Sequence, residues 1–266
     1  MTRGPAPWAA ITRYPDLEAV SAAAAAQLVT CGQAALAARG RFALALPGGS
    51  TPRRLFALLA SQHRDALDWG RAHFWWGDER AVPPDHPDSN YGLAHRTLLA
   101  PLGIAAHAQH RLHGEALDLA QAALDAAREL TAVLGEPPAL DLVVLGLGSD
   151  GHTASWFPHS PVVSPAVNDD DAPRSPWVVA NPVSSPLVGG QATRLTLTPR
   201  AVLHARAILV LVSGRDKARA LSQVLRGALD PAQYPAQLLA GAAEKVQWLV
   251  DHDAANDLGD LHDPRG

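Results

Sequence analysis

The chain is poor in cysteine, since its 266 residues include only Cys31. A single thiol excludes an internal disulfide and a cysteine metal cluster, and it is typical of a reducing cytoplasm. The chain also has no excess of basic residues: 22 Lys and Arg stand against 26 Asp and Glu, for a formal net charge of −4. This balance argues against nucleic acid as the main partner, so we expect any phosphate recognition to be local.

Long apolar runs are missing as well. Residues 1–16 lack the apolar segment of a signal peptide, and no window approaches the roughly 20 apolar residues that a membrane span requires. We therefore expect a soluble, cytoplasmic protein with no membrane partner, either a monomer or a homodimer. No ligand cluster has metal spacing, so we expect no metal and no cofactor.

Hydrophobic residues nevertheless make up 47% of the chain, which is enough to bury a large core. We expect one domain over residues 1–266, with about 10 N-terminal and about 14 C-terminal residues frayed. The acidic, proline-punctuated segment 162–175 is predicted to be a surface loop.

Apolar runs and helical spacing alternate along the chain. Strands are predicted over 41–46, 72–80 (running into a polar loop), 140–148, 177–181, 194–198, 205–213 and 245–251, and helices over 17–39, 53–62, 89–102, 117–134 and 214–227. This order predicts an α/β fold: a doubly wound, mainly parallel sheet with helices on both faces. In such a sheet the ligand lies beyond the carboxyl ends of the strands, where the polar stretches of this chain fall.

The first polar stretch is a glycine loop, "LPGGSTP", in which Gly48, Gly49, Ser50 and Thr51 precede a helix that begins with Pro52. Glycines let a phosphate approach the backbone, hydroxyls can donate to it, and the helix N-terminus offers unpaired N–H groups. The pattern indicates an anion site, although a capped turn that holds nothing is an equal alternative. It matches neither a P-loop nor the three-glycine dinucleotide fingerprint.

The second stretch, "WWGDERAVPPDHPDSNYG", places Asp78, Glu79 and Arg80 after a strand. A carboxylate can orient a sugar hydroxyl or a histidine, and a guanidinium can bind phosphate or carboxylate oxygens in a bidentate way. The alternative is a solvated run of charges. Trp75 and Trp76 are predicted to pack in the core.

The third stretch, "GLGSDGHTAS", follows the most strand-like run of the chain and contains Asp150 and His152. A neutral imidazole can take a proton from water, and a nearby carboxylate can orient it. A lone histidine is more often structural, but the glycines, the carboxylate and the position after a strand favour a general base. Arg194 and Lys217 each look like a surface charge alone, and together with these segments they can complete a phosphate pocket.

Taken together and in order, these segments resemble the 6-phosphogluconolactonases of the family that also contains glucosamine-6-phosphate isomerases. The resemblance covers about Arg41 to Lys217. It implies the fold of the glucosamine-6-phosphate deaminases and metal-independent hydrolysis of 6-phospho-D-glucono-1,5-lactone, a sugar phosphate lactone of the oxidative pentose phosphate pathway. The resemblance implies that His152 is the general base, that Asp150 supports it, and that Asp78 is a third catalytic residue, which lines the substrate site with Arg80. It also implies a phosphate and substrate pocket that contains Gly48, Gly49, Ser50, Thr51, Arg194 and Lys217.

Three positions depart from the family pattern. Trp156 stands where a smaller aliphatic residue is usual, His159 stands where glycine is common, and "NPVSSPLVGGQAT" before Arg194 is longer and richer in glycine than expected. None of these departures removes a proposed catalytic group, and we expect His159 to be a surface residue.

Two other functions fit parts of the pattern. A glucosamine-6-phosphate deaminase would share the fold and phosphate loop, but its Asn-Glu-Pro run after the histidine is replaced here by "HTASWFP", which has no glutamate. A sugar-phosphate sensor of a transcriptional regulator would carry a DNA-binding helix-turn-helix, and the first 40 residues contain no basic recognition helix. The lactonase is therefore favoured.

Overall fold

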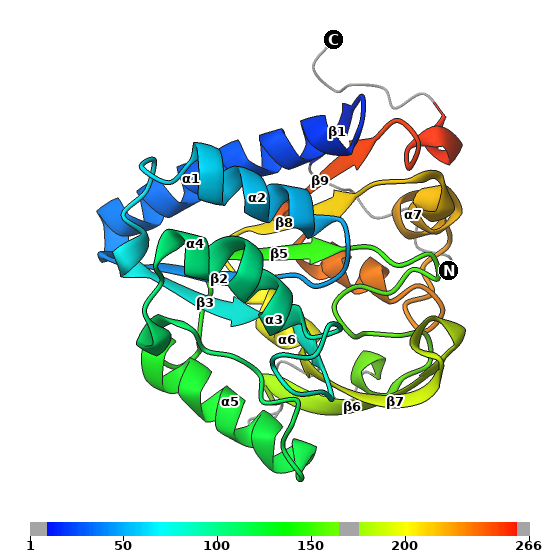
Figure 1. Ribbon diagram of the computed structural model, residues 1–266. Coiled ribbons are helices and arrows are strands. Elements are labelled where there is room, and N and C mark those ends of the chain that lie inside the picture. Colours follow the sequence, from blue (N-terminus) through cyan, green and yellow to red (C-terminus); the bar gives the residue numbers. More distant parts are fainter. Residues whose placement is uncertain (1–9, 165–175, 260–266) are drawn as a thin grey trace.

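The computed structural model describes residues 10–164 and 176–259 of the chain (Figure 1). Its strands are β1 (Ala10–Tyr14), β2 (Phe42–Leu46), β3 (Ala72–Trp76), β4 (Asp78–Arg80), β5 (Leu142–Gly146), β6 (Val178–Ser185), β7 (Gly190–Leu197), β8 (Ile208–Val212) and β9 (Val246–Asp251). Its α-helices are α1 (Leu17–Arg39), α2 (Pro52–Gln62), α3 (Asn90–Ala94), α4 (Ala100–Leu102), α5 (Leu119–Leu134), α6 (Pro199–Leu203) and α7 (Ala218–Arg226). Of the ends predicted to fray, residues 1–9 and 260–266 lie outside the described residues, as does 165–175 of the predicted loop 162–175. Residues 253–259 are described and include a 3-10 turn, Asn256–Leu258, in which Leu258 is completely buried.

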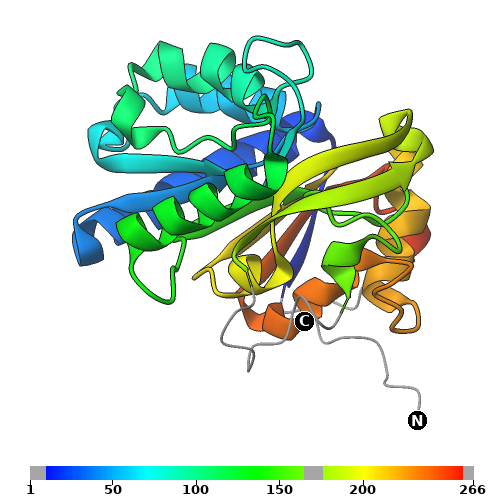
Figure 2. The same cartoon turned by 90° about the horizontal axis from the view of Figure 1, so that it is seen from below.

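Six strands form a parallel sheet in the order β1-β9-β8-β5-β2-β3. Every residue of β2 and β8 is buried, as expected of central strands covered on both faces. The two views place α2, α3 and α4 on one side of this sheet and the 3-10 segment Pro235–Lys245 on the other (Figures 1 and 2). The predicted doubly wound, mainly parallel fold is confirmed.

The strand order reverses between β2 and β5. The chain runs outward from β2 to β3 on one side and from β5 through β8 to β9 on the other. At such a reversal the loops after the two neighbouring strands turn away from each other and leave a crevice between them. Those loops are the glycine loop after β2 and, after β5, residues 146–155, which contain His152 and which we call the histidine segment. The topology therefore brings the two loops side by side.

A second, antiparallel sheet has the order β4-β7-β6. Figure 2 shows its long β6–β7 hairpin outside the parallel sheet. Gly77 joins the two sheets, since its N–H donates to Leu46 O at 2.9 Å and its carbonyl accepts from Leu197 N at 2.9 Å. The segment 72–80, predicted as one strand running into a loop, is therefore β3, a one-residue link, and β4 in another sheet.

Helix α1 begins at an Asp16 cap, whose carboxylate accepts from Ala19 N at 2.9 Å, and it ends before Gly40 as predicted. The expectation that no segment approaches a membrane span needs correction here. Among the described residues, α1 alone is long and apolar enough to cross a bilayer by length and composition, with a mean hydropathy of 1.3. Its buried residues belong to the core that covers the sheet, and a core helix passes the same test.

Trp75 and Trp76 are buried, as predicted, with 4% and 1% of their surface exposed, and His159 is exposed, also as predicted. Trp156, the residue that departs from the family pattern, is completely buried, and its indole N–H donates to Leu197 O at 2.7 Å. The larger side chain therefore anchors the histidine segment on β7.

Candidate active site

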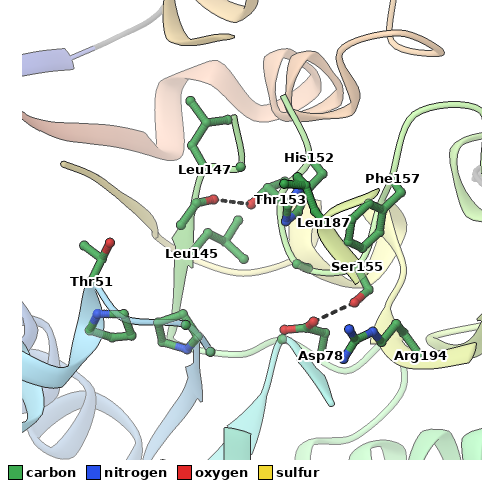
Figure 3. A pocket seen from close by; sticks show the side chains of 18 of the residues that line it. Thr51, Asp78, Leu145, Leu147, His152, Thr153, Ser155, Phe157, Leu187 and Arg194 are labelled. Atoms are coloured by element: carbon green, nitrogen blue, oxygen red, sulfur yellow. Dashed lines mark hydrogen bonds between the residues drawn. The ribbon is translucent and has the colours of Figure 1, made fainter. Parts of the chain in front are cut away.

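A cavity of about 240 Å³ opens at the carboxyl ends of β2, β5 and β8, beside the second sheet (Figure 3). All the site residues predicted from the sequence line it, except Asp150, which lies behind His152. The predicted residues on its wall are Gly48, Gly49, Ser50, Thr51, Asp78, Arg80, His152, Arg194 and Lys217. Residues that are distant in the sequence therefore share one pocket, although their roles stay predictions.

His152 is held on one edge by Asp150, whose Oδ1 lies 2.5 Å from the imidazole Nδ1. This contact assigns the Nδ1 proton to the edge that faces the carboxylate, which leaves Nε2 with a lone pair. Within the described part of the chain, Nε2 makes no hydrogen bond. Burial raises the pKa of Asp150, but the hydrogen bonds and charge of His152 outweigh it and leave that pKa below its ordinary value.

The ring of Phe157 stacks on the imidazole, with centroids 4.2 Å apart and planes at 20°. Gly148 lies against the same edge as Asp150, where a Cβ atom would come within 2.0 Å of His152 Nδ1 and 2.8 Å of Asp150 Oδ1. The glycine in this turn is therefore needed for space. The Thr153 hydroxyl donates to Gly146 O at 2.8 Å and ties the segment to the end of β5.

Asp78 and Arg80 both line the cavity because side chains two residues apart point to the same face of a strand. Asp78 Oδ2 accepts from the Ser155 hydroxyl at 2.6 Å (Figure 3). Its Oδ1 accepts from Asn90 Nδ2 at 3.2 Å. Neither Ser155 nor Asn90 was among the predicted site residues. Each has a side chain that can form hydrogen bonds, which is the only signal in the sequence for a contact with Asp78. The contact itself depends on the fold, because Ser155 and Asp78 are far apart in the sequence.

Glu79, the middle residue of the charged triplet, points away from the cavity. Only 2% of its surface is exposed, and its carboxylate accepts from the backbone N–H groups of Arg80, Asn90 and Tyr91 and from the Ser89 hydroxyl. Burial raises its pKa despite these bonds. Glu79 therefore has a structural role, because its hydrogen bonds hold β4 against the start of α3.

Arg80 and Arg194 are directly opposite each other on β4 and β7. Arg80 donates to Asp88 O at 2.6 Å, whereas the Nε of Arg194 is buried and has no hydrogen-bond partner among the described residues. Burial and then the charge of Arg80 lower the pKa of Arg194. Two like charges placed in this way repel each other, so an anionic group bound between them would relieve the repulsion.

The glycine loop lines the cavity at the start of α2. Thr51 precedes α2 and its side chain makes no capping hydrogen bond within the described residues, which leaves its hydroxyl available to an anion. Pro52 has no N–H, and Arg53 N already donates to Ser50 O at 3.2 Å. Gly48 is required by close packing, since a Cβ there would lie 2.0 Å from Asn90 Oδ1. Figure 3 places Thr51 well apart from Arg194, so the pocket has two separate polar ends.

Lys217 enters the same cavity from the turn after β8. Its ammonium lies 2.9 Å from Asp216 Oδ2, a carboxylate that is itself largely exposed. The turn is tied down by Asp251, whose carboxylate accepts from the Ser213 hydroxyl at 2.5 Å and from Gly214 N at 3.1 Å. Asp251 therefore positions the segment that carries Lys217.

Among the described residues, no group of three or more His, Cys, Asp or Glu side chains could hold a metal ion. The lining of the cavity offers cations, hydroxyls and backbone N–H groups instead. Such a lining suits a negatively charged, hydroxylated ligand.

The chain is similar to known proteins of one family. The family described as glucosamine-6-phosphate isomerases/6-phosphogluconolactonase matches residues 15–248. A 6-phosphogluconolactonase of Synechocystis sp. is 39% identical over 228 residues, which cover 84% of this chain and 88% of that protein. That of Mycobacterium tuberculosis is 35% identical over 256 residues, covering 92% and 96%.

Two solved structures extend the comparison. A 6-phosphogluconolactonase from Trypanosoma cruzi has a TM-score of 0.81 at 28% identity and covers 98% of this chain and 99% of its own. A monomeric glucosamine-6-phosphate deaminase has a TM-score of 0.73 at 21% identity, covers 93% and 99%, and shares the fold. The resemblance found in the motifs is confirmed: the chain belongs to the glucosamine-6-phosphate isomerase/6-phosphogluconolactonase family.

Proposed function

We propose that this protein hydrolyses 6-phospho-D-glucono-1,5-lactone to 6-phosphogluconate, with His152 as general base. Its curated relatives at 35 to 39% identity are 6-phosphogluconolactonases. The observation that carries the mechanism is the His152–Asp150 pair: Nδ1 is 2.5 Å from the carboxylate while the ring lines a cavity rich in cations. A base oriented in this way can activate water without a covalent nucleophile.

The proposed reaction uses this geometry. His152 Nε2 accepts a proton from water as the hydroxide attacks the lactone carbonyl carbon, and the ester becomes a tetrahedral oxyanion. When the bond from this carbon to the ring oxygen breaks, the imidazolium returns the proton to that oxygen, and the open-chain carboxylic acid forms. The acid then loses its remaining proton to solvent and becomes the carboxylate. Asp150 stabilises the imidazolium throughout, because it stays ionised at neutral pH.

The two polar ends of the cavity suit the two ends of this substrate. The loop Gly48–Thr51 and Lys217 can bind the phosphate through backbone N–H groups, hydroxyls and a cation. Arg80 and Arg194 then face the sugar-acid end, where negative charge develops on the carbonyl oxygen. Asp78, oriented by Ser155, can accept from a sugar hydroxyl.

The deaminase alternative calls for further carboxylates near the histidine. In residues 10–164 and 176–259 no glutamate lines the cavity, and the segment after His152 contributes Thr153, Ala154 and Ser155 to its wall. We therefore favour water attack on a lactone over proton transfer on an amino sugar. We also propose that the protein acts in the cytoplasm, as one domain, without metal or cofactor.

A direct test compares two reactions of the purified protein. Lactone generated in situ from glucose 6-phosphate should disappear much faster than by its spontaneous hydrolysis, while glucosamine 6-phosphate should release no ammonia. Ammonia release without lactone turnover would establish the deaminase instead, and inactivity in both assays would leave only a binding protein.

A further inference from the structure

The β6–β7 hairpin ends in a short turn, Pro186–Gly189, which we call the hairpin tip. It belongs to the stretch that departs from the family pattern. The two strands pair over their whole length, from Val178↔Leu197 to Ser185↔Gly190. The tip is fastened to them, because Leu187 N donates to the Ser185 hydroxyl at 3.2 Å and Gly189 N donates to Pro186 O at 3.2 Å. The tip is thus a defined turn at the end of a paired ribbon.

Leu187 lines the active-site cavity although 53% of its surface is exposed. The other leucines that line the cavity, Leu145, Leu147 and Leu211, are at least nine-tenths buried. An apolar side chain left in water at the mouth of a polar pocket gains free energy only when something covers it. In the projection of Figure 3, Leu187 lies between His152 and Phe157.

The hairpin tip also stands beside the arginine pair. Leu187, Val188, Arg80 and Arg194 together line a second hollow that adjoins the active-site cavity. The tip is therefore a thin wall with open space on both sides, and it places two apolar side chains next to two cations. A ligand suited to this wall combines an apolar face with anionic or polar edges.

A six-membered gluconolactone ring has this character, because its equatorial hydroxyls leave C–H bonds on the two faces. We propose that Leu187 and Val188 of the hairpin tip contact a C–H face of the bound lactone ring and so determine specificity for that ring. This inference rests on the proposed function. The contact is made to the ring, so the phosphate contributes nothing to it.

The test uses Leu187→Ala, Leu187→Asn and, as a matched control, Leu229→Ala, which truncates another exposed leucine. Because a half-exposed leucine gains only part of the free energy of burial, KM for the phosphorylated lactone should rise about 3- to 10-fold in both Leu187 variants, with kcat changed less than about 2-fold. Leu229→Ala should match the wild type. The inhibition constant of inorganic phosphate, which lacks a ring, should be the same in every variant.

Equal KM values in Leu187→Ala and Leu229→Ala would overturn the proposal, and so would a parallel loss of affinity for inorganic phosphate. Calorimetric binding of glucose 6-phosphate, a ring that is not hydrolysed, separates this inference from the proposed function. If the wild type has no lactonase activity, weaker binding of this ring to Leu187→Ala still supports the ring contact, and equal binding refutes it. Failure of the wild type both to turn over lactone and to bind the ring would refute both proposals.

Discussion

At the scale of single residues, the side chain of His152 is restrained on one edge and one face. Asp150 holds Nδ1, Phe157 covers one face of the ring, and Gly148, which has no Cβ, leaves room for the His152–Asp150 pair. Only Nε2 is left for a reaction partner. An imidazole restrained in this way loses little conformational entropy when the reactive complex forms.

Replacing the base tests this arrangement. We expect His152→Ala to lower kcat for the lactone by about a hundred- to ten-thousand-fold, because general-base assistance is lost, while KM changes little. His159→Ala, an exposed histidine seven positions along, should behave as the wild type. Near-normal turnover in His152→Ala, measured with lactone made in situ, would rule out the mechanism.

The carboxylate behind the base gives a separate prediction. The lowered pKa of Asp150 means that it is charged over the whole neutral range. Asp150→Asn removes this charge and destabilises the imidazolium, so kcat should fall and the acidic limb of its pH profile should move to lower pH. A profile that keeps its shape and position in Asp150→Asn would mean that Asp150 has no electrostatic role.

Phosphate recognition can be tested at Lys217. Lys217→Met keeps the length of the side chain and removes its charge, so KM for the phosphorylated lactone should rise at least about tenfold. The unphosphorylated glucono-1,5-lactone should be hydrolysed equally by both forms. Arg219→Met, which removes an exposed cation two positions on, serves as the control. An equal loss with both substrates would place Lys217 at the ring instead of the phosphate.

At the scale of elements, the sequence revealed the parallel sheet better than the antiparallel one. The strands β2, β5, β8 and β9 are apolar runs bounded by turns, so periodicity alone locates them. β4 is three residues of charged sequence, and it is a strand only because β7 pairs with it. Such pairing is tertiary, and for this reason the sequence showed the charges of Asp78 and Arg80 without the strand that orients them.

The same limit applies to the network around Asp78. The glycine loop, Asp78 and His152 could be selected because each lies in a distinctive local pattern. Ser155 and Asn90 lie within the same patterns, but their function depends on the distance to Asp78, which only the fold provides. β1 was missed because its residues are neither strongly apolar nor alternating.

A hydrogen-bonded chain at the other end of β3 makes a prediction about stability. His73 Nδ1 lies 2.9 Å from His110 Nε2, and His110 Nδ1 lies 2.6 Å from Glu129 Oε1 on α5. Burial lowers the pKa of His73 below its usual 6.5, and the charges of His110, His107 and Arg41 act in the same direction. The unfolded chain therefore binds a proton at His73 before the folded chain does.

The free energy of unfolding should accordingly decrease as the pH falls through about 6.5, until the folded pKa of His73 is passed. His73→Gln, which keeps a hydrogen-bonding side chain and does not titrate, should show a smaller decrease in urea unfolding between about pH 7.5 and 5.5. His252→Gln, an exposed histidine after β9, should keep the wild-type decrease. The same pH dependence in wild type and His73→Gln would refute this account.

At the scale of the whole molecule, the reaction proposed here requires no metal. The described residues hold no cluster with metal-ligating geometry, and His152 has an organic partner at Nδ1. Dialysis against a chelator should therefore leave lactone turnover within about twofold of the untreated enzyme, since water is activated by a base alone. Loss of activity that is restored by a divalent cation would contradict this expectation.

The cavity is built from segments that are far apart in the chain: the turns after β2, β5 and β8, and the paired strands β4 and β7. No single stretch contains more than a part of it. Lactone turnover should therefore appear late in refolding, after secondary structure has returned, and should disappear early on unfolding. Two inactive fragments divided within the hairpin tip would regain turnover only by reassociating, which makes the activity of this enzyme a reporter of its own assembly.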